Sequence, residues 1–328
     1  MTTFKQVRGS DILVLSSDPT TPELGQIWYN SSSGTLKGLA QATIAWASGG
    51  NLNTARASLG GANNGTSSAT LAFGGANPAV TGASESYNGT SWTNTPSLNT
   101  ARQGPGGAGT QTAALAFGGE GPPANLNVNN SESWNGSSWT ATPTLNTGRG
   151  GIGGTGLQTA ALAFGGSATP SYTASSATEK YNGTSWTSVN SMNTARSSMA
   201  SIGTQTAAIA AGGGPSATTE SYNGTSWTTV NSLNTARQSF AGAGTQTAGV
   251  AFGGYTTYPT TTGATETWNG TSWTTSPATL ATPRGEIAGA GSQASALGFG
   301  GGPPSAVSNK TEKFTGPGST VTRTLTVS

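Results

Sequence analysis

The stretch TEKYNGTSWTSVNSMNTARSSMASIGTQTAAIAAGG at residues 178–213 contains the features that decide the fold of this chain. A polar segment with a glutamate ends in an aromatic residue, an Asn-Gly pair follows, and a tryptophan opens the next segment. An arginine then precedes a run of small residues, and an apolar segment ends in Gly-Gly. Four short segments separated by turn residues are typical of four consecutive antiparallel strands.

This order of residues recurs six times along the chain. The arginine returns at steps of 41 to 47 residues, at Arg56, Arg102, Arg149, Arg196, Arg237 and Arg284. One glutamate per unit follows it, at Glu85, Glu132, Glu179, Glu220, Glu266 and Glu312. A tryptophan stands at Trp46, Trp92, Trp139, Trp186, Trp227 and Trp273. Six four-stranded units predict an all-β protein, a six-bladed β-propeller whose innermost strands run at about 57–63, 103–109, 150–156, 197–203, 238–244 and 285–291.

The two ends of the repeat suggest how the ring closes. Residues 43–48, around Trp46, resemble a fourth strand without its first three, and the last unit, 284–315, lacks a tryptophan. We therefore predict that the strand around Trp46 completes the last sheet and removes an open edge. The alternating segment TVTRTLTVS at 320–328 is an alternative closing strand. The expected domains are an N-terminal hairpin segment, 1–42, and a propeller, 43–328, that includes this C-terminal strand.

The Asn-Gly pair between the third and fourth segments predicts a short hairpin, because the favoured turn needs positive φ at both central residues. The pair begins at Asn88, Asn135, Asn182, Asn223 and Asn269. Asn-Gly-Thr/Ser also matches the glycosylation acceptor pattern, but its recurrence at one turn favours a structural role.

Composition excludes several classes of protein. The chain has 328 residues, no cysteine, no histidine and 7% charged residues. A disulfide framework, a thiolate site and imidazole catalysis are therefore excluded, and we expect no cofactor and no metal. The formal net charge is +2 without a basic cluster, and no apolar run approaches the ~20 residues of a spanning helix. We expect neither nucleic-acid binding nor membrane insertion.

The arginine and glutamate of each unit have two interpretations: a ring of ion-binding sites, or a structural latch that fixes strands. Six identical copies favour the latch, and we interpret the repeated tryptophans as core residues. By contrast, the loop between the second and third strands varies, with 8 to 14 residues from the first Gly of the pair to the glutamate. These loops are residues 76–84, 120–131, 167–178, 214–219, 255–265 and 302–311.

Variable loops on one face of a fixed scaffold are where recognition usually lies, although drift without a function is the alternative. Aromatic side chains in the loops can stack on a sugar face, so the expected contacts are Tyr172, Tyr255 and Tyr258. Because the loops carry little charge, we expect a neutral ligand such as a glycan.

A double glycine, an aromatic residue, a tryptophan and an arginine before the next innermost strand resemble the Kelch repeat. The resemblance covers residues 46–316, although the YNGTSW link is shorter than is usual in that family. The copper site of Kelch-like oxidases needs histidines and a cysteine-linked tyrosine, which this chain lacks, and we expect no enzyme. A glycosidase pair could come only from Glu120, Glu286 or the repeat glutamates.

Residues 18–39, DPTTPELGQIWYNSSSGTLKGL, lie outside the repeat and predict a hairpin of strand GQIWYN, turn SSSG and strand TLKGL. They resemble a segment of tailed-bacteriophage fibre and appendage proteins, through Pro22, Gly25, Gln26, Trp28, Tyr29, Asn30, Gly34, Leu36 and Lys37. The resemblance implies a virion protein, assembled in the host cytoplasm in several copies or as a homo-oligomer. Residues 1–40 would bind other virion proteins, with Trp28 and Tyr29 as the expected attachment residues. A capping hairpin without a partner is the alternative.

The leading hypothesis is therefore a non-enzymatic virion structural protein, resembling a tail fibre, whose propeller recognises a bacterial surface glycan. A free-standing bacterial carbohydrate-binding lectin is the alternative, and a propeller hydrolase or lyase is a third.

Overall fold

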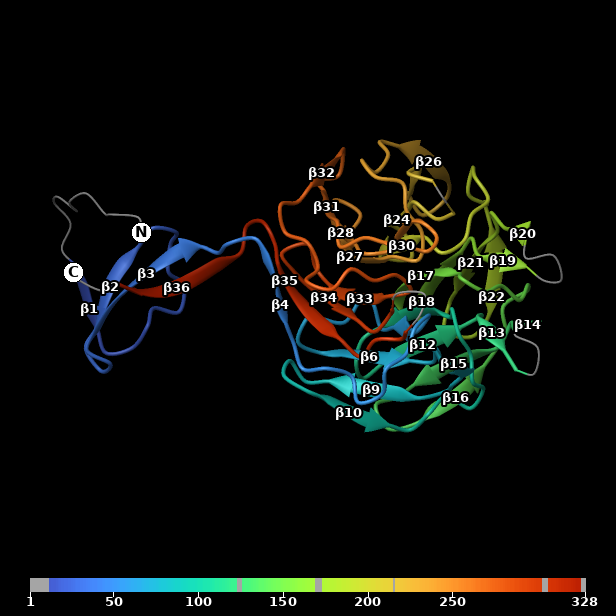
Figure 1. The fold of residues 1–328 in the computed structure, drawn as a ribbon, viewed down its shortest axis with the longest axis horizontal. Coiled ribbons are helices and arrows are strands. Elements are labelled where there is room, and N and C mark those ends of the chain that lie inside the picture. Colours follow the sequence, from blue (N-terminus) through green and yellow to red (C-terminus); the bar gives the residue numbers. More distant parts are fainter. Residues whose placement is uncertain (1–11, 123–125, 169–172, 215, 303–305, 326–328) are drawn as a thin grey trace. The chain divides into compact units, whose positions relative to one another are not determined.

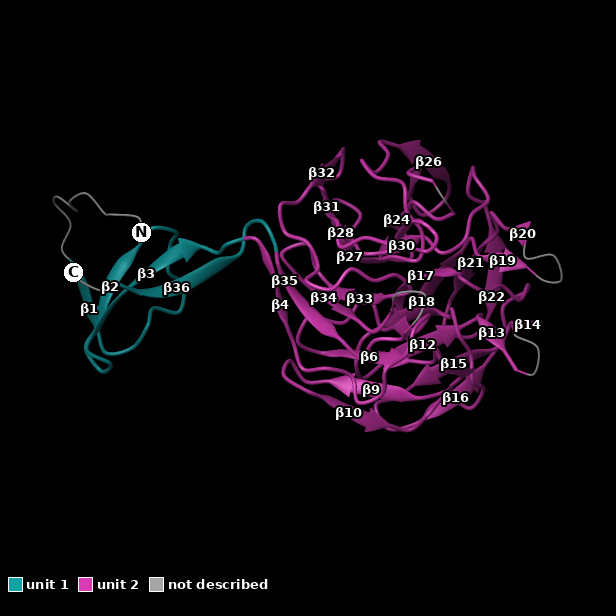
Figure 2. Cartoon of the chain, in the orientation of Figure 1, with its two compact units in different colours: residues 1–43, 316–328 teal, residues 44–315 magenta. Residues whose placement is uncertain are grey.

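The computed structural model describes residues 12–122, 126–168, 173–214, 216–302 and 306–325, and every regular element in these residues is a β-strand (Figure 1). The all-β class agrees with the density of Gly, Ser and Thr, which are poor helix formers. No helix long and apolar enough to cross a membrane occurs in the described residues. The chain divides into unit 1, Met1–Thr43 with Gly316–Ser328, and unit 2, Ile44–Thr315 (Figure 2).

Unit 2 is built from four-stranded antiparallel sheets, one for each sequence unit. The first three, from inner to outer strand, are β5 (Gly60–Gly61), β6 (Thr70–Phe73), β9 (Ser84–Tyr87) and β10 (Trp92–Thr95); β11 (Gly106–Gly109), β12 (Ala114–Phe117), β15 (Ser131–Trp134) and β16 (Trp139–Thr142); and β17 (Gly153–Leu157), β18 (Ala160–Phe164), β21 (Thr178–Tyr181) and β22 (Trp186–Val189). The next three are β23 (Ala200–Gly203), β24 (Ala208–Ala211), β25 (Thr219–Tyr222) and β26 (Trp227–Val230); β27 (Ala241–Thr245), β28 (Ala248–Phe252), β31 (Thr265–Trp268) and β32 (Trp273–Thr275); and β33 (Ala288–Gly291), β34 (Ser295–Phe299), β35 (Thr311–Thr315) and β4 (Ala45–Ser48).

The innermost strands follow one another around a common centre (Figure 1). Each contacts the next in the order β5, β11, β17, β23, β27 and β33, and β33 contacts β5 again. The last sheet takes its outer strand from the beginning of the unit, because β4 pairs antiparallel with β35 and sets Trp46 opposite Phe314. This arrangement of sheets is compatible with a β-propeller.

The innermost strands begin about three residues later than the sequence predicts. Five of the six expected segments start with a residue that makes an isolated bridge to the loop after Gly-Gly, as Gln103 does with Glu120. The next residue has a left-handed backbone, with φ of 57° at Gly104. A strand cannot continue through that conformation, so the regular ladder starts only at Gly106.

The hairpins between the third and fourth strands differ from the predicted two-residue turn. Tyr87 pairs directly with Trp92, which leaves a four-residue loop. In this loop only Gly89 has positive φ, at 93°, and the Asn88 side chain accepts hydrogen bonds from the backbone of Thr90 and Ser91, both at 2.9 Å. The asparagine thus supplies a side-chain turn of the Asx type rather than a left-handed residue.

Tryptophans join neighbouring sheets. The Trp139 ring packs edge-on against Phe73 of the preceding sheet, with ring centroids 5.3 Å apart. Its indole nitrogen donates to the Ser84 hydroxyl at 3.2 Å, and the indole of Trp46 donates likewise to Thr265 at 2.9 Å. Each sheet therefore packs its outer aromatic residue on the neighbour, which buries apolar surface between sheets.

The variable loops contain small ribbons of their own. Two-stranded hairpins form in four of them, among the described residues: β7 (Ala76–Asn77) with β8 (Ala79–Val80), β13 (Glu120–Gly121) with β14 (Leu126–Asn127), β19 (Ser167–Ala168) with β20 (Thr173–Ala174), and β29 (Tyr255–Thr257) with β30 (Thr260–Thr261).

Unit 1 is a separate four-stranded sheet in the order β1 (Leu13–Leu15), β2 (Ile27–Asn30), β3 (Thr35–Gln41) and β36 (Thr320–Leu325). The predicted hairpin is confirmed, since β2 and β3 pair across residues 31–34. The C-terminal strand, however, pairs with β3 and not with the repeat sheets. The expected domain 43–328 is therefore too long at its C-terminal end, because Gly316–Ser328 belongs to unit 1. The physical reason is that β4 already occupies the free edge of β35.

Candidate functional site

The repeat arginines are buried inside unit 2. Arg196 donates from Nη1 to the carbonyl oxygens of Gly212, at 3.2 Å, and of Thr218. Its Nη2 lies 2.8 Å from Glu220 Oε1. Burial lowers the pKa of Arg196 from its ordinary value, and the charge of Glu220 opposes that shift. The corresponding ion pairs are Arg56–Glu85, Arg102–Glu132, Arg149–Glu179, Arg237–Glu266 and Arg284–Glu312.

The glutamate of each pair also holds the loop that precedes the arginine. Glu220 Oε2 accepts from the backbone of Asn193 at 2.7 Å, and Oε1 accepts from Thr194 at 3.2 Å. The side chain of Asn193 then donates to the carbonyl of Trp227 at 3.1 Å. The arginines and glutamates thus bind backbone and each other, which is the geometry of the expected latch, and their carboxylates are not open to a ligand.

Residues two positions after the arginines form a ring around the common centre. Each of the six has positive φ between 51° and 57°. The backbone N–H of each donates to the carbonyl of the preceding one at 2.7 to 3.1 Å, and the first donates to the last. The members are Ser58, Gly104, Gly151, Ser198, Ser239 and Glu286. We call this set the axial ring.

A cavity of about 240 Å³ opens at the axial ring. Below the ring, the next residue of each unit contributes a buried apolar side chain to the cavity wall: Leu59, Pro105, Ile152, Met199, Phe240 and Ile287. Gln103 and Glu120 complete the lining. The cavity therefore has a polar mouth and an apolar interior.

The cavity is continued along the inner strands by a second one of about 100 Å³, which Asn63 lines. Here Asn63 donates to the carbonyl of Gly154, and Asn64 donates to that of Gly203 at 3.2 Å. These bonds cross the centre from the first repeat to the third and fourth. They are made possible by two extra residues, because Arg56 and Gly74 are 18 residues apart where the other units have 16. The first repeat therefore reaches across the centre.

The axial ring has one member with a charge. Glu286 Oε2 accepts a hydrogen bond from the Ser58 hydroxyl at 2.9 Å. Glu120, the first residue of a variable loop, accepts from Gln103 Nε2 at 3.0 Å. The structure thus brings into one cavity the two acids of residues 44–315 that lie outside the repeat pattern. Within the described residues, no group of three or more His, Cys, Asp or Glu side chains could hold a metal ion.

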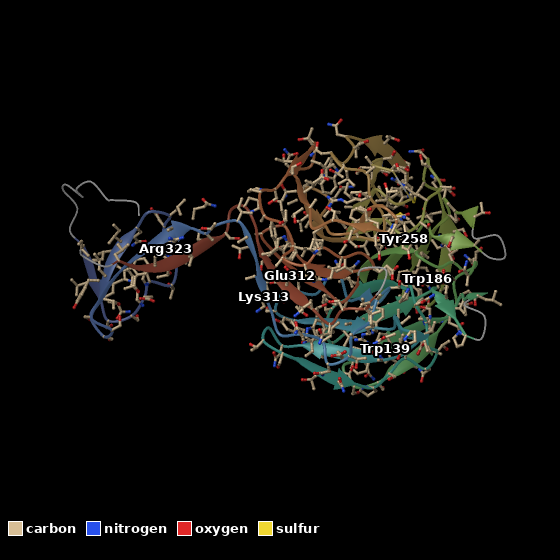
Figure 3. All side chains as sticks on the ribbon, viewed as in Figure 1. Trp139, Trp186, Tyr258, Glu312, Lys313 and Arg323 are labelled. Carbon is tan, nitrogen blue, oxygen red and sulfur yellow. The ribbon has the colours of Figure 1, made fainter. Side chains whose placement is uncertain are left out.

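Of the three tyrosines expected to contact a ligand, one is buried, one is exposed and one lies outside the described residues. Tyr255 is buried, and its hydroxyl donates to the carbonyl of Gly302 at 3.2 Å. Burial raises the pKa of Tyr255, and the carboxylate of Glu286 adds to the effect. Tyr255 is therefore a packing residue and not an exposed contact, because it begins β29 and bridges Gln238. Tyr258, labelled in Figure 3, is 60% exposed, whereas Tyr172 lies outside the described residues.

Trp28 of the N-terminal motif is also not a free surface residue. Its ring is fully buried in unit 1, and its indole nitrogen donates to Asp18 at 3.0 Å. Asp18 accepts further from Lys37 at 2.8 Å and from Asn30 at 2.8 Å. Tyr29 alternates to the other face of β2 and is half-buried. The side chains of this motif thus pack and hydrogen-bond within unit 1.

Sequence reasoning missed the axial ring and a set of bridging glutamines. Gln205 Nε2, in the turn between β23 and β24, donates to the carbonyls of Tyr181 at 2.6 Å and Ala161 at 3.1 Å in the preceding sheet. The signal was present as Gly-Thr-Gln-Thr in several units. No protein-family model matches the chain, and no curated protein matches it either.

Proposed function

We propose that the chain is a non-enzymatic structural protein of a tailed-bacteriophage virion. Residues 44–315 form a six-bladed, Kelch-like propeller that recognises a glycan on the host surface, and unit 1 attaches the chain to other virion proteins. The observation that carries the recognition role is the cavity at the axial ring. Glu120 belongs both to this cavity and to the variable loop 120–131, so the cavity adjoins a loop that differs between units.

The six-bladed interpretation is supported by three sets of contacts that each return to their start. The inner strands contact one another in a cycle, and the axial ring links its last member, Glu286, to its first, Ser58. The Trp46 indole bonds to Thr265 of the preceding sheet, as the indoles of Trp92, Trp139, Trp227 and Trp273 bond to a hydroxyl of theirs. With β4 in place every sheet of the ring has four strands, and the edges that remain are short outer strands.

The attachment role is supported by the exposed apolar side chains of unit 1. Leu13, Val14 and Leu24 are 51%, 67% and 60% exposed. Leu13 and Val14 lie in β1, a short edge strand parallel to β2. Apolar side chains at a sheet edge are a typical protein-binding surface. We therefore assign attachment to this apolar edge instead of to Trp28.

The test is the composition of purified phage particles. The chain is expected in particles in a fixed copy number, and the full chain with Val14→Asp is expected to be lost from them while it still folds. Thr322→Asp, on the opposite edge strand of the same unit, is the matched control and is expected to be retained. Absence of the chain from particles would refute the virion role and leave the free-standing lectin.

The meeting of Glu120 and Glu286 in one cavity favours a second candidate, a glycoside hydrolase, because such enzymes work with two carboxyl groups. Release of reducing sugar from host polysaccharide by the full chain, lost in Glu286→Gln, would establish it in place of simple binding.

A further inference from the structure

We infer that the cavity at the axial ring binds one sugar-sized ring that carries a free ammonium group, that is, an amino sugar without an acetyl cap. The inference rests on the proposed recognition function for its biological role and deepens it by naming the ligand class. It departs from the neutral ligand expected from the loop sequences, because the cavity holds charges that the loops as a whole do not.

The size and shape of the cavity set the size of the ligand. Its volume of about 240 Å³ lies below the ~300–1,000 Å³ of pockets that take drug-sized molecules. On the far side, the bonds of Asn63 and Asn64 across the centre leave only the smaller cavity of about 100 Å³. A single ring fits this space, while a longer chain would have to continue over the variable loops.

The charge of the cavity determines the sign of the charge that a ligand carries. Of the acids in residues 44–315, two lie outside the six latches, Glu120 and Glu286, and both line this cavity. Among the described residues that line it there is no lysine and no arginine. One oxygen of each carboxylate has no hydrogen-bond donor from the described part of the chain. Two carboxylates without a cation attract an ammonium group, which donates three hydrogen bonds.

The remaining lining suits a sugar ring. The hydroxyls of Ser198 and Ser239 stand on the axial ring, half-buried at the cavity mouth. Apolar side chains such as Phe240 and Ile287 lie directly below them. Hydroxyls that bond the polar edge of a ligand, above apolar groups that contact its C–H face, form the mixed lining typical of ligand sites.

Glu286 also departs from its own repeat. The equivalent positions carry only serine or glycine, and a φ of 54° is unfavourable for a long side chain. Keeping a glutamate there sacrifices stability at the one ring position that brings a carboxylate to the cavity. Strained backbone conformations of this kind persist at functional sites. At Glu286 the strained position brings a carboxylate to the cavity.

The test is calorimetric titration of the full chain with glucosamine, N-acetylglucosamine and glucose at low ionic strength. Glucosamine is expected to saturate, and the two sugars without a free amine are expected to bind about 10- to 100-fold more weakly. Glu286→Gln is expected to remove most of that difference. Glu23→Gln, which changes an exposed acid of unit 1 in the same way, is the matched control and is expected to keep it.

Several results overturn the inference. They are equal binding of the three sugars, no saturation by glucosamine, or unchanged discrimination in a folded Glu286→Gln variant. Saturation by Ca²⁺ that displaces glucosamine completely would point to a cation site instead and would also overturn it. If glucosamine does not bind but the chain still blocks phage adsorption, this inference fails and the proposed function stands. If glucosamine binds but the chain is absent from particles, the virion role fails and the site stands.

Discussion

Removing one arginine from a latch tests whether the repeat residues hold the sheets. Arg196→Ala deletes a buried guanidinium that bonds two backbone carbonyls and Glu220. The carboxylate of Glu220 is itself fully buried and would remain without its cation. The change therefore leaves a buried charge with backbone N–H donors alone.

The expected loss is large for one substitution. Breaking a buried ion pair by removing one partner costs about 3–5 kcal/mol, because the other charge stays desolvated. The two carbonyls that lose their donor belong to Gly212 and Thr218, and they bring the estimate to the upper part of that range. The free energy of unfolding of a domain is only about 5–15 kcal/mol, so the variant should be close to the limit of folding.

Urea unfolding followed by tryptophan fluorescence measures the effect, with Arg323→Ala as the matched control, since Arg323 is exposed in unit 1 (Figure 3). The control should change the free energy of unfolding by no more than about 0.5 kcal/mol. Glu220→Gln in the Arg196→Ala background should recover at least about 1 kcal/mol, because it removes the stranded charge. A loss below about 1 kcal/mol, or a double variant in which the two costs simply add, would refute the latch.

Three further predictions concern the hairpins, unit 1 and the axial ring. Gly183→Val should lower the free energy of unfolding by about 1 kcal/mol or more, because Gly183 has a φ of 92° and a β-branched residue resists that conformation. The cost does not come from crowding, since an added Cβ would lie 3.6 Å from Thr159. A thermal melt equal to that of the parent contradicts the prediction. Hydrogen bonds, first from Lys37, lower the pKa of Asp18 from 3.8 to about 2, so unit 1 should keep this stabilisation above pH ~4 and lose it as the pH falls toward 2. The indole N–H resonance of Trp28 should report this loss, and Asp18→Asn should abolish its pH dependence. Glu286→Gly should raise the free energy of unfolding by about 1 kcal/mol while glucosamine binding disappears, and lower stability in urea would contradict the strain at φ 54°.

The architecture was predictable because the repeat constrains spacing. The arginine of each latch stands 16 residues before Gly-Gly in five of the six units, and the sheet-joining tryptophan stands at a fixed distance after the glutamate, whereas the variable loop lets the separation of arginine and glutamate range from 24 to 30 residues. The spacing from Glu220 to Trp227 is the same 7 residues as that from Glu132 to Trp139. Residues that make the same contacts in every unit thus recur at regular intervals, and this repeat can be recognised in a single sequence. The pairing of β4 with β35 was predictable for the same reason, because the last unit has no tryptophan and Trp46 stands before the first complete unit.

The candidate site was predictable only in part, since the repeat period does not determine which side chains are exposed. Tyr255 stands in a variable loop, yet the bridge to Gln238 turns its ring inward and buries it. Trp28 belongs to a distinctive motif, yet an indole that bonds Asp18 is a core residue. The strand 320–325 alternates like a closing strand, but which edge it joins depends on the edges left free, and only the three-dimensional structure shows that β3 was free.

Departures from the repeat are the better guide to function in a chain of this kind. Six equivalent ring positions could all have been serine or glycine, and five are. Six equivalent turns could all have been of one length, and the first is longer and places Asn63 and Asn64 across the centre. One departure carries two asparagines across the centre and the other puts a carboxylate at the cavity, so together they give a symmetric scaffold an asymmetric, acidic cavity. Neither recurs in the other units, whereas the ion pair of arginine and glutamate is present in all six. A feature that the scaffold does not need, and that lowers its stability at Glu286, is best explained by a ligand.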